Sequence, residues 1–184
     1  MKRLACAVCL TVLVSGIPFR AQAPARPGPD YKELEAWAGN WTFQGYFKES
    51  PSGSANKLDW SWEGRWRPGG RFLEIHGVLK VAGNEDRYLE ILGYDPQKGA
   101  WVGYVFHDSG IQEVYACTFD GLTCLENGED RSPDGKVLRW RHVWKFSPDR
   151  MSVSGICEAE ADGSWWTVFE VKGARSGGKE AKRP

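Results

Sequence analysis

The fold is decided by residues 39–48, which read GNWTFQGYFK. From Trp41 onward apolar and polar side chains alternate with a period of two, which is typical of a half-buried β-strand. Trp41 stands at the start of this strand, where a large ring can close one end of a barrel. Residues 39–48 therefore predict the first strand of a closed β-barrel.

The rest of the chain repeats this alternation in short segments separated by turn signals. Glycines lie inside several segments, where they weaken a flat sheet but allow a barrel to bend. Short hairpin connections favour an up-and-down barrel over a Greek-key sandwich. We expect an all-β, up-and-down antiparallel barrel of about ten strands over residues 30–172. Leu89, Ile91 and Gly93 are expected on the apolar face of one strand, and residues 129–135 are expected to form a charged loop.

The two ends of the chain are expected to lie outside the barrel. Residues 1–23 have a basic start, an apolar run and a small-residue cleavage site, so we interpret them as a signal peptide that directs the protein to the periplasm or out of the cell. The apolar run is too short for a membrane span. Residues 24–29 predict a disordered leader and residues 173–184 a disordered basic tail. Residues 30–38, with Asp30 as the N-cap, predict a short helix that plugs the barrel.

Composition restricts the classes of partner. The 24 Lys and Arg residues balance 24 Asp and Glu residues, and the basic ones are scattered. Nucleic-acid binding needs clustered basic side chains, so the sequence predicts no nucleic-acid partner. The ten tryptophans supply rings that either fill a core or line a cavity.

Three motifs carry a family resemblance. They are WAGNW at residues 37–41, RWRPGGRF at residues 65–72 and LGYDPQKGAWVG at residues 92–103. In these motifs the chain resembles the DUF1579 family of uncharacterised proteins, and its Gly-x-Trp resembles that of lipocalin-like barrels. The resemblance covers residues 31–172 and implies a lipocalin-like barrel. The family has no established catalytic or ligand residues to transfer, so the resemblance leaves the function open.

The three histidines do not have the spacing of a metal site. His76 shares a face with Glu74 and is expected to point to solvent. His142 shares a face with Trp140 and Trp144, which is typical of a core histidine and less often of a polar anchor in a ligand cavity. Nitrobindin-like barrels of similar design bind haem through histidine, which makes His142 the only candidate axial ligand. However, residues 151–172 contain no histidine, and a Cys-x-x-Cys-His motif is absent.

No catalytic set is evident. The sequence has no Gly-x-Ser-x-Gly elbow, and Glu74 and Glu90 both fall on polar faces of their predicted strands. Arg139 and Arg141 alternate with Trp140, so they are expected to be exposed. If a bulge swapped the faces, their guanidinium groups would instead bind a ligand carboxylate. The sequence predicts no catalytic residue, metal or cofactor.

Three cysteines remain once residues 1–23 are removed: Cys117, Cys124 and Cys157. Cys117 and Cys124 flank the hairpin signal Asp120-Gly121 symmetrically, and a two-residue turn there would place them opposite each other. We therefore predict a disulfide between Cys117 and Cys124. Three free buried thiols, or a pair that includes Cys157, are the alternatives.

The resulting functional hypothesis is an exported barrel that binds a small apolar or amphipathic molecule in its interior. The predicted ligand-binding residues are Trp60, Trp62, Tyr104, Trp140, His142 and Trp144. One alternative is a filled barrel that acts as an interaction or scaffold protein. A haem-binding barrel is the other.

Overall fold

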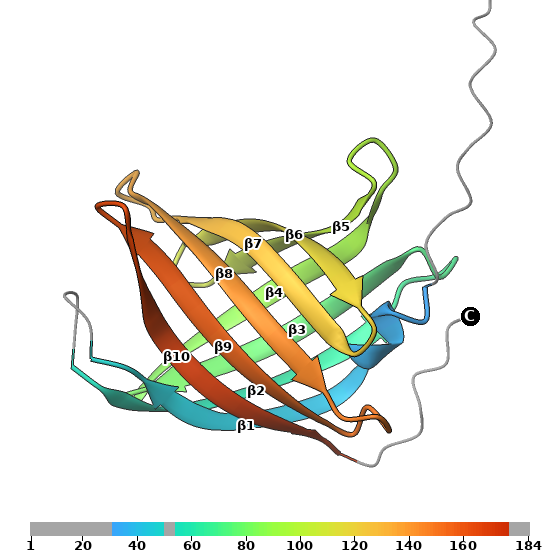
Figure 1. Ribbon diagram of the computed structural model, residues 1–184, viewed down its shortest axis with the longest axis horizontal. Helices are drawn as coiled ribbons and strands as arrows, with labels where there is room; N and C mark the ends of the chain where they lie inside the picture. Colours follow the sequence, from blue (N-terminus) through green and yellow to red (C-terminus); the bar gives the residue numbers. More distant parts are fainter. Residues whose placement is uncertain (1–30, 50–53, 177–184) are drawn as a thin grey trace, which may run out of the picture.

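The computed structural model describes residues 31–49 and 54–176. These residues form one closed barrel in which each strand is antiparallel to its neighbour in the sequence, and β1 pairs with β10 to close the sheet (Figure 1). The strands are β1 (Gly39–Phe47), β2 (Asn56–Trp66), β3 (Phe72–Val81), β4 (Asn84–Asp95), β5 (Ala100–His107), β6 (Gln112–Asp120), β7 (Thr123–Arg131), β8 (Val137–Phe146), β9 (Ser152–Ala161) and β10 (Ser164–Arg175). The prediction of an up-and-down barrel of about ten strands is confirmed.

The glycines inside the strands make room for aromatic rings. Six of them are directly opposite an aromatic residue on the neighbouring strand, and a Cβ added at any of the six would lie 2.0 to 2.6 Å from an atom of that ring. The pairs are Gly77 with Tyr88, Gly93 with Phe72, Gly103 with Tyr115, Gly128 with Trp140, Gly155 with Trp144 and Gly173 with Phe43. Each ring therefore lies across its neighbouring strand. Phe72 does so on the outer surface, and for the other five rings this packing fixes their positions inside the barrel.

The N-terminal plug is a single turn and not the helix predicted over residues 30–38. Among the described residues 31–38, the helical ones are those of η1 (Leu34–Ala36), which is of the 3-10 type, and Gly39 follows with a φ of 90°. Tertiary contacts hold this segment in place, because so short a helix has little stability of its own. The guanidinium of Arg175 donates to the backbone oxygens of Glu35 and Ala38.

The plug still closes one end of the barrel, beside the start of β1 (Figure 1). Trp37 is buried, and its ring lies 4.8 Å from that of Phe146 and 5.6 Å from that of Trp62. Gly64 is required here, because a Cβ would come within 2.5 Å of the backbone oxygen of Trp37. The same end contains the buried ring of Trp41, which has the closing role that its position in the sequence predicts.

Two predicted boundaries differ from the structure. β10 continues to Arg175, beyond residue 172, because Gly173, Ala174 and Arg175 pair with β1. β7 continues to Arg131, so the first part of the predicted loop 129–135 is strand. The predicted signal peptide, leader, Asp30 cap and the tail from residue 177 lie outside the described residues.

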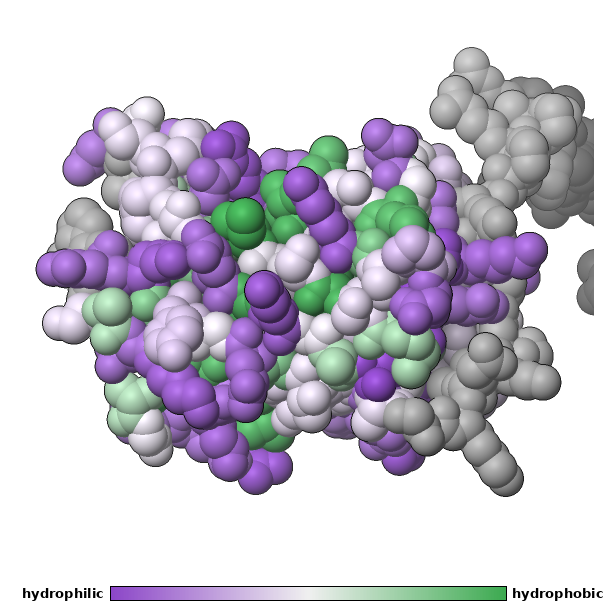
Figure 2. All heavy atoms as spheres, turned by 60° about the horizontal axis from the view of Figure 1, so that its bottom comes forward, coloured by the Kyte–Doolittle hydropathy of each residue, from purple (hydrophilic) through white to green (hydrophobic). Residues whose placement is uncertain are grey.

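The outer surface is mainly hydrophilic, and in Figure 2 smaller hydrophobic groups are scattered among polar side chains. Arg139 and Arg141 lie on this surface, as predicted, and contact Glu160 and Glu158 respectively. His76 is also exposed, with Nε2 2.8 Å from Oε1 of Glu74. Within the described residues, no helix is long and apolar enough to cross a membrane.

Candidate functional site

The barrel interior contains a cavity of about 280 Å³ to which every strand contributes. It begins at the ring of Trp37 and extends to the opposite end of the barrel, where Phe47, His107 and Asp130 lie near the ends of their strands. β10 has a bulge between Thr167 and Phe169, and the side chains of Val168 and Phe169 both line the cavity. A space of this size is close to the lower limit for small-molecule sites.

Five of the six predicted ligand-binding residues line this cavity: Trp60, Trp62, Trp140, His142 and Trp144. Tyr104 does not. Its side chain is 48% exposed on the outer surface, because Val105 faces inward and Gly103 lies against the ring of Tyr115. The prediction for β5 was therefore wrong by one residue, and the residues of this strand that line the cavity are Val105 and His107.

The face predicted for β4 was also wrong. Tyr88, Glu90 and Leu92 point inward, whereas Leu89 and Ile91 do not line the cavity. Both faces of this strand carry apolar side chains, so alternation alone could not distinguish them. The correct face brings Glu90, which the sequence assigned to a polar outer face, into the middle of the cavity.

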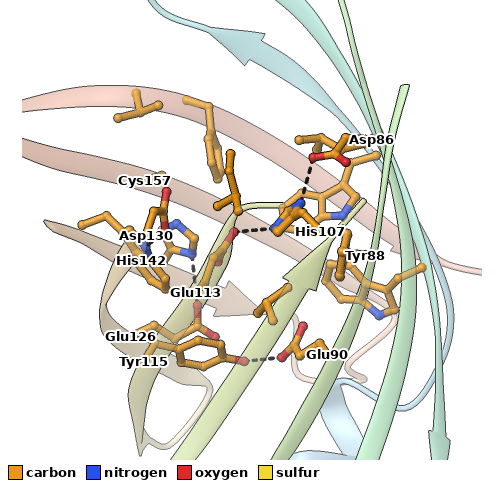
Figure 3. Close-up of a pocket in the computed structure, with 18 of the residues that line it drawn as sticks. Asp86, Tyr88, Glu90, His107, Glu113, Tyr115, Glu126, Asp130, His142 and Cys157 are labelled. Atoms are coloured by element: carbon orange, nitrogen blue, oxygen red, sulfur yellow. Dashed lines mark hydrogen bonds and ion pairs between the residues drawn. The ribbon is translucent and has the colours of Figure 1, made fainter. Parts of the chain in front are cut away.

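One polar cluster surrounds His107. Its Nδ1 is 2.9 Å from Oδ2 of Asp86, and its Nε2 is 2.7 Å from Oε1 of Glu113 (Figure 3). Ser109 Oγ donates to the same Asp86 oxygen over 2.9 Å. Burial opposes a charge on His107, but Glu113 and Asp86 outweigh it and raise the pKa of the imidazole. The two carboxylates thus favour the protonated, cationic form of His107.

A second cluster surrounds Glu126, the one charged residue among those described that is fully buried. Oε2 of Glu126 accepts a hydrogen bond from Nε1 of Trp144 at 2.9 Å and lies 3.0 Å from Nδ1 of His142. Burial again opposes a charge on His142, but Cys157 and Glu126 raise its pKa well above the ordinary value. Its ring also stacks on Trp140 at 4.1 Å, so this histidine is fixed on several sides.

Glu90 and Asp130 differ from the other carboxyl groups because their donors are neutral. The hydroxyl of Tyr115 donates to Glu90, and Nε1 of Trp140 donates to Asp130. Burial raises the pKa of Glu90 to about 8, with nearby Glu126 and Glu113 adding to the effect. Burial, followed by the charge of Glu113, raises the pKa of Asp130 to about 7.

Tyr88 completes the polar lining. Its hydroxyl accepts a hydrogen bond from Nε1 of Trp60 at 2.8 Å, and burial followed by the charge of Glu90 raises its pKa well above 10. Tyr88 is therefore a neutral phenol whose own proton is available for a hydrogen bond. The cavity thus combines aromatic rings with hydrogen-bonding groups at fixed positions.

The structure corrects the hairpin on which the predicted disulfide depended. Asp120 pairs with Thr123, so the turn is Gly121-Leu122, and Cys124 is opposite Phe119 and not opposite Cys117. The three described cysteines are free thiols in the structure. Cys117 and Cys124 nevertheless lie on the same inward face as diagonal neighbours, because Cys117 is opposite Glu126 and Cys124 is two residues before Glu126, so their oxidation to a disulfide stays a prediction.

Cys117, Cys124 and Glu126 form the one group of described residues whose ligand atoms are close enough for a metal, all within 4.8 Å of one another. Two thiolates and a carboxylate could hold a zinc-like ion. However, Glu126 already accepts hydrogen bonds from Trp144 and lies against His142, and burial raises the pKa values of both thiols. This arrangement is that of a satisfied core network.

The residues around His142 do not fit an axial haem ligand. Glu126 occupies Nδ1, the thiol of Cys157 hydrogen-bonds the ring, and Trp140 covers one of its faces. Both nitrogens of His107 contact carboxylates as well. A histidine that binds haem iron needs one nitrogen directed at the metal, and the contacts of both interior histidines leave none.

Several site residues escaped the sequence reasoning, namely Asp86, Glu90, Glu113, Glu126 and Asp130. All are acidic residues in strands, where an acid normally marks the solvent face. The signal that could have found them is their register with the aromatic residues, since Glu126 and Asp130 alternate with Gly128, the partner of Trp140.

Comparisons with known proteins agree with this fold. Residues 26–175 match the family described as protein of unknown function (DUF1579). Among solved structures, the chain is similar to that of Rv2717c from M. tuberculosis, with a TM-score of 0.59 and 14% identity over 82% of this chain and 99% of that chain. At this identity the likeness shows the fold alone. A search of curated proteins gave no match.

Proposed function

The chain belongs to the DUF1579 family, and we propose that its barrel binds a small amphipathic molecule in the interior cavity. The observation that carries this proposal is the cavity itself, about 280 Å³ in volume and lined by aromatic rings together with fixed polar groups. Ligand sites in proteins combine a mainly apolar wall with a few convergent polar groups. The rings of Trp60 and Trp144 supply such a wall, and Tyr88 and Glu90 supply such groups.

Binding can be tested by titrating the protein with fatty alcohols, alkylamines, fatty acids and aromatic dyes while its tryptophan fluorescence is recorded. Trp60, Trp62, Trp140 and Trp144 all line the cavity, so a ligand there should change the emission. Absence of a response to the whole panel would contradict the proposal and favour the filled, ligand-free barrel.

A pair of variants on β5 locates the site. Val105 is buried and lines the cavity, whereas Tyr104 is on the outer surface of the same strand. We expect Val105→Phe to occupy part of the cavity and to weaken binding about tenfold, since a larger side chain excludes ligand volume. Tyr104→Phe is the matched control and should bind as the wild type does. Equal affinities of both variants would place any ligand outside the cavity.

We also propose that the protein is exported. The support is the signal-peptide pattern of residues 1–23, with a basic start and a small-residue site at Ala21-Gln22-Ala23. N-terminal sequencing of the purified mature protein tests this, and a start at Pro24 is expected. A mature protein that retains Met1 or Lys2 would contradict it.

A further inference from the structure

We propose that the cavity selects an organic cation, namely a small molecule with a protonated amine and an apolar body. This inference rests on the proposed function and specifies the class of ligand. It follows from three features of the cavity: its charge, the two carboxyl groups that lack a cationic partner, and the aromatic rings around them.

The charged groups that line the cavity are mostly acidic. Five carboxyl groups face two imidazoles, and no lysine or arginine of the described residues contributes to the lining. The acids are Asp86, Glu90, Glu113, Glu126 and Asp130, and the imidazoles are those of His107 and His142. Even with both histidines charged, the ionised cavity would hold an excess of negative charge. A buried charge of this kind needs a counter-charge.

The two histidines contact three of the five acidic residues. His107 contacts Asp86 and Glu113, and His142 contacts Glu126. Glu90 and Asp130 are left with neutral donors only, one each. Among the described residues nothing donates to the second oxygen of either carboxyl group, so an ammonium group that enters the cavity finds two acceptors without competition.

Aromatic rings complete a site for a cation. The rings of Tyr88 and Tyr115 lie on either side of Glu90 in Figure 3, and Tyr115 donates to it. The indoles of Trp60 and Trp140 line the same cavity. Aromatic faces attract cations through their quadrupole, more strongly where water is excluded. A neutral ligand would use the rings but would leave the carboxyl groups without a counter-charge, and an anionic ligand would be repelled.

The protonation state of Glu90 is consistent with a cationic ligand. The pKa of Glu90 is raised to about 8 because burial and the neighbouring acids outweigh the opposing effects of the Tyr115 hydrogen bond and of His142, which does not contact Glu90 directly. The groups that face it are Tyr88 on its own strand, Glu113 and Tyr115 on β6, Glu126 on β7 and His142 on β8. At pH 7 the free protein therefore keeps a proton on Glu90. An arriving ammonium group favours the ionised form, and that proton passes to the buffer.

The test compares three ligands of equal length by isothermal titration calorimetry: octylamine, 1-octanol and octanoate. We expect octylamine to bind about tenfold more tightly than octanol or better, as a hydrogen bond to a charged group provides, and octanoate to bind most weakly. Equal or tighter binding of octanol or octanoate would overturn the cation inference but leave the proposed function intact. If none of the three binds and the wider panel also fails, the proposed function itself is wrong.

Variants assign the effect to the carboxyl group. Glu90→Gln keeps the shape but removes the charge, so it should weaken octylamine binding about tenfold and should weaken octanol binding much less. Glu74→Gln on the outer face of β3 is the matched control and should behave as the wild type. Asp130→Asn is a second variant, used if Glu90→Gln does not fold. Unchanged amine affinity in the folded cavity variants would overturn the inference.

Proton release is an independent readout. Octylamine binding at pH 7, measured in phosphate and in Tris, should differ in observed heat because these buffers take up protons with different enthalpies. The difference should correspond to release of up to one proton, and Glu90→Gln should reduce it. Octanol should show no such difference. Amine binding that shows no buffer dependence in the wild type would contradict the ionisation of Glu90 on binding.

Discussion

The two halves of the barrel interior are built differently. At the plugged end, rings pack on rings: Trp37 contacts Phe146, and Trp41 stacks on Phe43 at 5.8 Å. In the other half, carboxyl groups and histidines project into a cavity. The plugged half has the dense apolar packing of a protein core, whereas the open half contains buried ionisable groups that weaken the folded state unless they are compensated. The contrast suggests that stability comes from one half and ligand recognition from the other.

The largest expected effect comes from emptying the plug. Trp37→Ala should lower the free energy of unfolding by about 3–5 kcal/mol, because it removes a buried indole and leaves a void between Trp62, Trp144 and Phe146. Urea unfolding followed by circular dichroism measures this. Trp37→Phe is the control. Within the part of the chain that the structure describes, the buried Nε1 of Trp37 has no hydrogen-bond partner, so this substitution loses packing only. A loss below 1 kcal/mol in Trp37→Ala would show that the plug does not carry the stability.

The second largest effect on the free energy of unfolding is expected when a side chain is added at a glycine that lies against an aromatic ring. A Cβ at Gly103 would lie 2.2 Å from the ring of Tyr115, so Gly103→Ala should cost about 1–3 kcal/mol as overpacking. In the Tyr115→Ala background the same change should cost much less, since the ring is gone. A double-mutant cycle by urea unfolding measures this coupling. Additive effects would mean that the glycine serves another purpose.

The sequence predicted the plugged half better than the open half. Trp41 and Phe43 alternate with polar residues, so periodicity identifies their inward face without ambiguity. The hairpin signals were sufficient to give the strand number and order. The helix over residues 30–38 was wrong, because local capping signals cannot show that tertiary contacts will hold a single turn instead. The turn at Gly121-Leu122 also lies one residue later than predicted.

The open half breaks the rule on which the prediction relied. Glu90 and Asp130 are acids on inward faces, and in β4 apolar Leu89 and Ile91 lie on the other face. For such a strand the alternation of apolar and polar residues predicts the wrong inward face, because the prediction assumes that acidic side chains face water. Their partners, Tyr115 and Trp140, come from other strands, and only the pairing register shows which residues meet.

The third prediction concerns the pH dependence of stability. From pH 5 to 7 Glu90 keeps its proton in the folded protein, where its pKa is about 8, and loses it in the unfolded chain. The raised pKa values of Asp130 and His142 act in the same direction. The folded state therefore holds more protons. Each such proton contributes about 1.4 kcal/mol per pH unit, so stability should fall by about 1–3 kcal/mol per pH unit in this window.

Urea unfolding at pH 5, 6, 7 and 8 measures this slope. Glu90→Gln cannot ionise, so its slope should be shallower and the variant should be more stable than the wild type at pH 8. Glu74→Gln is the control on the outer surface, and its slope should match the wild type because the lowered pKa of Glu74 keeps that group ionised throughout. Stability that rises with pH in the wild type would contradict the assignment of buried, protonated carboxyl groups.

The smallest effect on stability and binding is expected from a substitution on the outer surface. This test distinguishes the contribution of interior residues from that of surface charges. Arg139 is 73% exposed, and its Nη1 is 3.8 Å from Oε2 of Glu160. Solvent and salt screen such a pair, so Arg139→Ala should change the free energy of unfolding by less than about 0.5 kcal/mol and leave octylamine binding unchanged. The neighbouring inward residue provides the comparison: Trp140→Phe, one position along β8, removes the donor to Asp130 and should alter both quantities. If the exposed arginine mattered as much as the buried tryptophan, charge on the outside of the barrel would have to be part of the binding site.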